Sequence, residues 1–173
     1  MEVCFILIDD SSYVLSKTKH QIISYNPNII IKTYECPPEF FEDDFLVQNK
    51  PHFIILCDYD MPIMNGLKVH NRLKDFPSQI TELISFFLFT SYTESTLSLE
   101  EFDSHFFKGL IQKPLTRSSF DKCIALAKKI TTIRPTRLFV LILIQTNHYV
   151  IIYNLKQTEY DIRLIVIEFN INI

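Results

Sequence analysis

Three carboxylates in this chain stand directly after runs of apolar residues. Asp9 and Asp10 follow the run at residues 3–8, and Asp58 follows the run at residues 53–57. Carboxylates brought close together repel one another, and a hard divalent cation is the usual way to stabilise such a cluster. An Asp carboxylate beside Mg²⁺ can also attack phosphorus and become an aspartyl phosphate. The three residues therefore predict an acidic magnesium pocket suited to phosphoryl transfer.

A hydroxyl and an amine follow two further apolar runs. Thr90 ends the run that begins at Leu83, and Lys113 follows the short run at residues 110–111. A lysine ammonium pairs with phosphoryl oxygens, and a threonine hydroxyl donates a hydrogen bond to one of them. Thr90 and Lys113 are thus the candidate phosphate-binding groups of the chain.

These polar residues can meet only if one sheet carries them all. Short apolar runs predict five strands, at residues 3–8, 29–33, 53–57, 83–89 and 110–111. Helical spacing and cap residues predict helices between and after these strands. The first helix would be capped by Ser11 or Ser12 and ended by Asn26. The others are expected at residues 37–47, 67–76, 93–102 and 118–130. Strict alternation favours an α/β fold, an open parallel sheet with helices on both faces. The carboxyl ends of its strands meet at one edge, where the five polar residues would converge.

Composition limits the remaining classes of function. A chain of 173 residues with 47% hydrophobic residues predicts one domain, or one domain and an appendage, with a buried core. A net charge of -3 argues against a dedicated nucleic-acid binder. The four cysteines form no C-x-x-C pair, which favours reduced thiols in an intracellular protein. The longest apolar run, residues 138–144, is far shorter than the roughly 20 residues of a membrane span, so we expect a soluble cytoplasmic protein.

The last 40 residues change character. They contain three β-branched, apolar stretches without any glycine, at about residues 137–144, 149–155 and 162–169. The strands and helices before them already make a closed architecture. We therefore expect a domain at residues 1–131 and a β-prone C-terminal extension at residues 132–173, with no recognisable output domain. A chain ending near Ile133 should fold and keep the chemistry of Asp58.

The nine residues from Asp58 to Gly66 carry a specific motif. They read D-Y-D-M-P-I-M-N-G and resemble the pattern D-x-x-M-P-x-M-x-G of the receiver domains of two-component response regulators, the CheY-like superfamily. The resemblance spans about residues 3–131. It implies a flavodoxin-like, doubly wound, five-stranded sheet of order 2-1-3-4-5. It also implies that Asp58 is the phosphoacceptor, and that Asp9, Asp10, Asp58 and the backbone carbonyl of Asp60 hold Mg²⁺.

The same resemblance assigns roles to residues at the ends of the last two strands. Thr90 would be the switch hydroxyl, and Lys113 would bind the phosphoryl group, followed by Pro114 in a peptide that the family often has in the cis form. Gly66 would be structural. The chain departs from the family at Leu110, where a switch Tyr or Phe is usual, and at Ser91, where a small Ala is usual.

The function implied is that of a stoichiometric phosphoacceptor rather than an enzyme. A histidine kinase or histidine phosphotransfer protein would donate the phosphoryl group to Asp58 in a Mg²⁺-dependent reaction. The modified domain would then bind a downstream protein through a surface at residues 93–129, which comprises the fourth helix, fifth strand and fifth helix of the family. Direct binding to nucleic acid and a membrane span are not expected.

Two alternatives remain open from the residues alone. A hydrophobic strand followed by D-x-D is also typical of haloacid-dehalogenase-like phosphatases, in which Asp58 would be the nucleophile and Asp60 the general acid and base. That family needs a further acidic motif after the lysine, and no acid beyond Lys113 follows a strand at the right place. The other alternative is a pseudo-receiver that binds partners without being phosphorylated.

Overall fold

The computed structural model describes residues 2–49, 51–93, 96–97 and 99–132, and three strands beyond them. Its first 132 residues form one compact unit around a five-stranded parallel sheet of order β2-β1-β3-β4-β5. The strands are β1 (Val3–Ile8), β2 (Ile30–Tyr34), β3 (His52–Cys57), β4 (Ile84–Thr90) and β5 (Phe107–Gln112). The strand order and the parallel pairing confirm the fold expected from the sequence.

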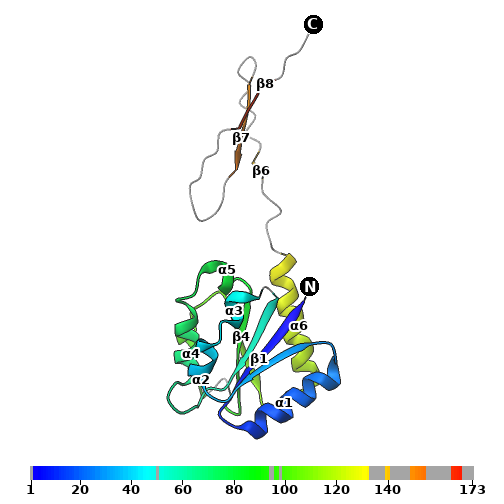
Figure 1. Ribbon diagram of the computed structural model, residues 1–173, viewed down its shortest axis with the longest axis vertical. Helices are drawn as coiled ribbons and strands as arrows, with labels where there is room; N and C mark the ends of the chain where they lie inside the picture. The colour runs from blue at the N-terminus through cyan, green and yellow to red at the C-terminus, as the bar shows by residue number, and fades with distance from the viewer. Residues whose placement is uncertain are drawn as a thin grey trace. The chain divides into compact units, whose positions relative to one another are not determined.

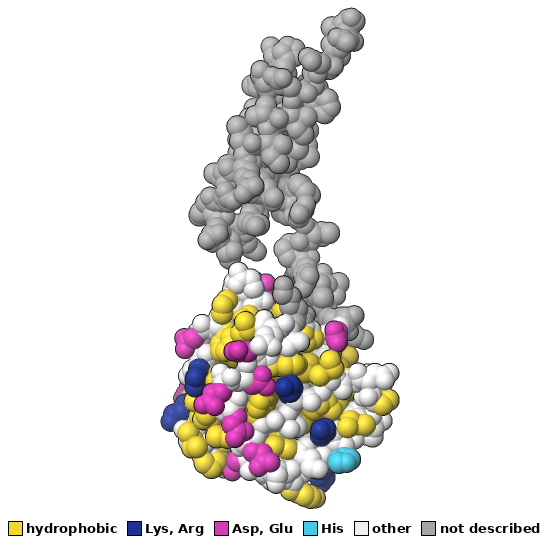
Figure 2. Space-filling view, in the orientation of Figure 1, with side chains coloured by type: hydrophobic (Ala, Val, Ile, Leu, Met, Phe, Trp, Pro, Cys, Tyr) yellow, Lys and Arg dark blue, Asp and Glu magenta, His cyan; other side chains and the backbone are white. Residues whose placement is uncertain are grey.

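Helices cover both faces of this sheet. They are α1 (Ser12–Tyr25), α2 (Pro37–Glu42), α3 (Phe45–Gln48), α4 (Gly66–Leu73), α5 (Ser78–Thr81) and α6 (Arg117–Thr132). Helices α1 and α6 lie together on one face, and α2 to α5 lie on the other (Figure 1). Acidic side chains gather on the part of the surface where α2 lies, which agrees with the solvated character of its charges (Figure 2).

The two faces of the sheet bury separate hydrophobic cores. One core contains Ile6, Ile55 and Leu88, whose side chains point toward α2 to α5, and the other contains Phe5, Leu56 and Phe89, whose side chains point toward α1 and α6. Strands β3 and β4 are buried along their whole length because side chains on both of their faces are covered. This explains why their sequences read as continuous apolar runs.

The prediction of a helix at residues 93–102 is wrong. Of that segment, the described residues contain only a 3₁₀ turn, η1 (Leu99–Glu101). Thr96 shows the physical reason, because its hydroxyl donates to the Thr93 carbonyl at 2.7 Å and accepts from the Thr93 N–H at 3.2 Å. Threonine side chains that bond to nearby backbone groups in this way compete with helix formation.

Two other expected helices are shorter than predicted. The helix expected at residues 37–47 is divided into α2 and α3, and the Asp43 carboxylate between them accepts from the Phe45 N–H at 3.0 Å. The helix expected to reach residue 76 ends at Leu73. The fifth strand, in contrast, is longer than expected and begins at Phe107.

Strand β5 contains a bulge opposite Phe86 and Phe87. Phe107 pairs with Phe86, but Gly109 rather than Lys108 pairs with Phe87, so Lys108 is an extra residue in the ladder. Gly109 has a φ of 111°, a conformation that glycine adopts without the steric cost a side chain would bring.

Residues 133–173 form a second compact unit. Its described strands are β6 (Phe139–Val140), β7 (Tyr149–Asn154) and β8 (Ile165–Glu168), and they pair antiparallel in the order β6-β7-β8. The three apolar stretches of the tail each contain one of these strands. Within the described part of the chain, no helix combines the length and the apolar character of a membrane span.

Candidate functional site

The strand register brings four of the predicted residues to one edge of the sheet. Ile8 pairs with Cys57, so Asp9 and Asp58 are the next residues of neighbouring strands, and the Asp58 N–H donates to the Ile8 carbonyl at 2.8 Å. At the end of β4 the Thr90 carbonyl accepts from the Lys113 N–H at 2.9 Å. Residues separated by about a hundred positions in the sequence thus meet at the carboxyl ends of the strands, as predicted.

Lys113 joins the two buried carboxylates. Its Nζ lies 2.6 Å from Asp9 Oδ2 and 2.9 Å from Asp58 Oδ1. The other oxygen of Asp9, Oδ1, accepts from the Ser11 N–H at 3.0 Å, which orients the Asp9 carboxylate as α1 begins. The ammonium group therefore bridges β1 and β3 at the atom that would act as nucleophile.

The acidic pocket contains a third carboxylate. Asp9, Asp10 and Asp58 each offer a carboxylate oxygen, and these oxygens lie within 4.8 Å of one another. Asp10 is exposed, whereas Asp9 and Asp58 are buried. Three carboxylates stand around one lysine, so the acidic groups of the pocket outnumber the ammonium group. An all-oxygen donor set with this charge fits a hard divalent cation such as Mg²⁺, which keeps several waters and needs few protein ligands.

Burial and charge act in opposite directions on Asp58. Burial raises the pKa of the Asp58 carboxyl above its usual value, and Lys113 opposes this rise by stabilising the carboxylate. Burial alone would lower the pKa of the Lys113 ammonium, but Asp9 and Asp58 raise it above the usual value. Lys113 is therefore charged at neutral pH and favours the ionised form of the carboxylates beside it.

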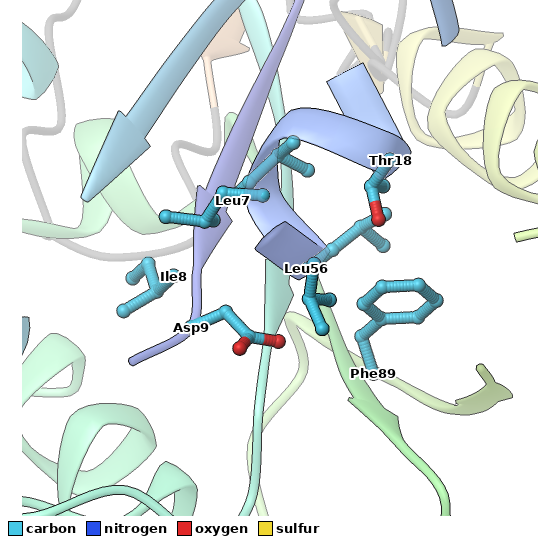
Figure 3. A pocket seen from close by; sticks show the side chains of 8 residues that line it. Leu7, Ile8, Asp9, Thr18, Leu56 and Phe89 are labelled. Atoms are coloured by element: carbon cyan, nitrogen blue, oxygen red, sulfur yellow. The ribbon is translucent and has the colours of Figure 1, made fainter. Parts of the chain in front are cut away.

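The floor of the pocket is apolar. Figure 3 shows the Asp9 carboxylate pointing from the end of β1 toward the side on which Leu56 and Phe89 lie. The crevice that these residues form with Leu7 and Thr18 has no space for a water molecule. Water is thus excluded beneath Asp9, and charge interactions are stronger there than at an open surface.

A cavity of about 250 Å³ is lined in part by Lys113. Residues of α1, among them Tyr13 and Lys17, form one wall, and Ser91 and Pro114 stand on the opposite side. The Lys113–Pro114 peptide bond is cis, as the resemblance implied. Lys113 can therefore be reached from the surface between α1 and this loop.

The motif loop after Asp58 is held by close backbone contacts. The Gly66 N–H donates to the Tyr59 carbonyl at 2.8 Å. A Cβ atom at position 66 would lie 2.6 Å from the Asp58 backbone oxygen and 2.9 Å from Leu88 Cδ2, so only glycine fits. The Asn65 side-chain oxygen accepts from the Lys68 N–H at 3.0 Å and caps α4.

Ile63 in the same loop has an uncommon backbone conformation. Its φ is 70°, and 76% of its surface is exposed. A β-branched residue is rarely found in the left-handed region, where its side chain crowds the backbone. Sequence reasoning missed this strain because the motif leaves the position unspecified.

The other predicted residues lie as follows. Thr90 is buried at the end of β4, and its hydroxyl oxygen accepts from the Tyr92 N–H at 3.4 Å. Asp60 is exposed, two residues after Asp58, and the metal-binding role of its carbonyl stays a prediction. Leu110 is buried in the core that faces α2 to α5, so no aromatic side chain occupies that place in β5.

The histidines lie in different surroundings. From the sequence alone helix-face or loop positions are expected for all five; His52 departs from this because it begins β3, and both His52 and His70 are buried. His20 and His105 are exposed, and His148 lies outside the described residues. His70 does belong to a helix, but it is buried because the rings of Phe102, Phe106 and Phe107 pack against it from a distant part of the sequence.

Several solved structures with the same fold are described as response regulators. A receiver protein from Dyadobacter fermentans shares 19% sequence identity with a TM-score of 0.63, and the match covers 73% of this chain and 98% of that one. A two-component response regulator from Cytophaga hutchinsonii shares 18% identity with a TM-score of 0.66, covering 74% and 98%. One from Legionella pneumophila shares 23% identity with a TM-score of 0.60, covering 74% and 99%.

Comparisons by sequence add no closer relative. No protein-family model matches the chain. No curated protein matches it either. The resemblance to receiver domains is confirmed at the level of the fold: the chain has the receiver fold over about three quarters of its length.

Proposed function

We propose that the protein is a phosphoaccepting receiver, in which Asp58 takes a phosphoryl group from a phosphohistidine of a kinase or phosphotransfer protein. The observation that carries this proposal is the position of Lys113, whose Nζ lies 2.6 Å from Asp9 and 2.9 Å from Asp58 within a pocket of three carboxylates. A cation at this point would meet the charge that develops on a transferring phosphoryl group.

The chemistry requires an ionised, accessible carboxylate. An Asp58 oxygen attacks phosphorus, the P–N bond to the donor imidazole breaks, and that nitrogen keeps the electron pair and takes up a proton. Lys113 favours the carboxylate form of Asp58 before the reaction and pairs with a phosphoryl oxygen after it. When bound by Asp9, Asp10 and Asp58, Mg²⁺ would neutralise charge on the transferred group. Attack by water later releases inorganic phosphate and restores the carboxylate.

The surroundings of the pocket suit such a reaction. The apolar floor beneath Asp9 excludes water from one side, which favours slow loss of the phosphoryl group. The Thr90 hydroxyl would donate to a phosphoryl oxygen from the end of β4. The protein would thus be a stoichiometric acceptor rather than a turnover enzyme.

Labelling with acetyl phosphate and Mg²⁺ tests the proposal. Intact-mass spectrometry of the full chain should show one added phosphoryl group, lost in Asp58→Asn and absent when the divalent ion is chelated. Asp75→Asn, which changes an exposed carboxylate outside the pocket, is the matched control and should label normally. Stoichiometric labelling that persists in Asp58→Asn would overturn the assignment, and no labelling at all would favour a pseudo-receiver.

A second measurement separates the receiver from a phosphatase. We expect negligible multiple turnover of a simple monoester such as p-nitrophenyl phosphate. Rapid turnover that collapses in Asp60→Asn would instead indicate the dehalogenase-like reaction, because only there does the Asp60 carboxylate transfer a proton.

A further inference from the structure

The segment before β5 is unusually rich in aromatic residues that surround one imidazole. The rings of Phe102, Phe106 and Phe107 lie 5.0, 5.2 and 6.0 Å from the His70 ring, and the Phe86 ring lies 5.6 Å from it. This cluster occupies the same core as Leu110, the residue that replaces the usual aromatic switch. Near the expected partner-binding surface at residues 93–129, the aromatic side chains therefore pack around α4, and position 110 of β5 carries none.

His70 also ties α4 to that segment by a hydrogen bond. Its Nε2 lies 2.7 Å from the Ser104 hydroxyl oxygen, and its Nδ1 lies 3.2 Å from Asn71 Oδ1. The imidazole is fully buried, and burial lowers its pKa, so it is neutral at physiological pH. One turn further along α4, Lys74 forms an ion pair with Asp103. Two consecutive residues of the segment are thus attached to one helix.

The other end of α4 rests on the phosphoacceptor. Its first residue, Gly66, is packed so closely against the Asp58 backbone oxygen that no side chain fits between them. Asn65 caps the helix and fixes its start. An α-helix of this length is a stiff rod of roughly 12 Å, so a shift at its first turn is passed to its last turn rather than absorbed.

We propose that α4 transmits the state of Asp58 to residues 99–107 through the His70–Ser104 hydrogen bond and the phenylalanine cluster around it. This inference rests on the proposed function, because it describes how phosphorylation at Asp58 would reach a partner-binding surface. In receiver domains that keep the strand-five aromatic, that side chain reports the state of the site. Here Leu110 lacks a ring that could do so, and the contact between α4 and residues 102–107 supplies a different route.

Amide hydrogen exchange of the full chain, with and without beryllium fluoride and Mg²⁺ as a phosphate mimic, tests the route. In the chain without substitutions, the mimic should change the amide exchange rates of residues 99–107 by about fivefold or more. A change of about fivefold is the lower end of typical coupling between sites. Ser104→Ala removes the hydroxyl that pairs with His70 and that also accepts from the Phe107 N–H at 3.2 Å, but it removes no ring. In this variant the change should fall below about twofold. A purely structural role would raise exchange in both states and leave the difference between them intact.

Lys74→Met is the matched control. It removes the exposed ion pair to the neighbouring Asp103 but keeps the His70–Ser104 bond, and exposed ion pairs contribute little. The mimic-dependent change should survive in this variant. Labelling of each variant with acetyl phosphate separates the two hypotheses. Failure to label the unmodified sequence contradicts the proposed function, whereas normal labelling with an unchanged response in Ser104→Ala overturns the route through α4.

Discussion

Two kinds of buried polar group occur in this molecule, and they are built differently. At the carboxyl end of the sheet, Lys113 faces Asp9 and Asp58, so the buried carboxylates outnumber the cations. Elsewhere, His52 and His70 are each buried opposite one serine hydroxyl, with His52 Nε2 lying 3.0 Å from Ser85 and His70 Nε2 lying 2.7 Å from Ser104. Both imidazoles have a lowered pKa because of burial, and both are neutral.

The difference separates structural polar groups from a reactive site. A neutral pair satisfies its hydrogen bonds locally, so it can be buried without a counter-ion. A cluster with excess negative charge is destabilising until a cation compensates that charge, and such imbalance is typical of functional sites. By this criterion the candidate site is the charged rim formed by Asp9, Asp10, Asp58 and Lys113, whereas the histidine pairs are internal contacts between elements of the fold.

The largest expected effect comes from removing the Lys113 ammonium group from the charged rim. Lys113→Met leaves Asp9 and Asp58 opposed without an ammonium group, and it deletes the proposed partner of the phosphoryl oxygens. We expect the rate of labelling by acetyl phosphate to fall about 10²- to 10³-fold, the usual cost of losing one such group. Lys68→Met, on the exposed side of α4, should label at the normal rate. Equal rates in the two variants would contradict the role of Lys113.

A second test asks whether labelling at Asp58 depends on the close packing of Gly66 against the Asp58 backbone. In Gly66→Ala the new Cβ would meet the Asp58 backbone oxygen, and we expect a loss of about 1–3 kcal/mol in the free energy of unfolding together with slower labelling. Gly109→Ala is the comparison, because its Cβ meets no atom within 4 Å and only its φ of 111° is strained. It should lower stability in a urea titration without slowing the labelling of folded protein.

A third test concerns the neutral pairs and pH. The pKa of His52 is lowered from 6.5 to about 4, mainly by burial, so the unfolded chain binds more protons than the folded chain between these values. Stability should therefore fall as the pH drops from about 6.5 toward 4, and no such loss should occur above that window. His52→Gln should flatten the dependence of Tm on pH. His20→Gln, at an exposed helix position, should leave the slope unchanged.

The smallest effect is expected in the motif loop. Ile63→Asn places a residue that tolerates the left-handed region where an isoleucine is now strained, and little buried surface is lost because the side chain is 76% exposed. We expect a gain of about 1 kcal/mol or less in the free energy of unfolding, measured with urea. Ile23→Asn, on the exposed face of α1, should instead lower stability slightly because asparagine is a poorer helix former. A loss in Ile63→Asn would show that its conformation carries no strain.

The sheet and the rim could be predicted from the sequence because both depend on short local patterns. Strands buried on two faces appear as unbroken apolar runs, and polar residues directly after them must lie at the same edge. The segment between Thr90 and Lys113 could not be predicted in the same way. Its hydroxyl side chains bond to the local backbone at Thr96, and the burial of His70 depends on phenylalanines more than 30 positions away. Such long-range contacts leave no periodic signal in the sequence.

The bulge in β5 has a consequence for insertions and deletions. If Lys108 is left out, the remaining residues alternate regularly between the two faces, with Phe107 and Leu110 on one face and Ile111 on the other. Lys108 is therefore a supernumerary position that the ladder tolerates because Gly109 absorbs the extra residue in its backbone. A residue count between Thr90 and Lys113 is consequently a poor guide to spatial correspondence, and an alignment gap placed at position 108 keeps both cores in register.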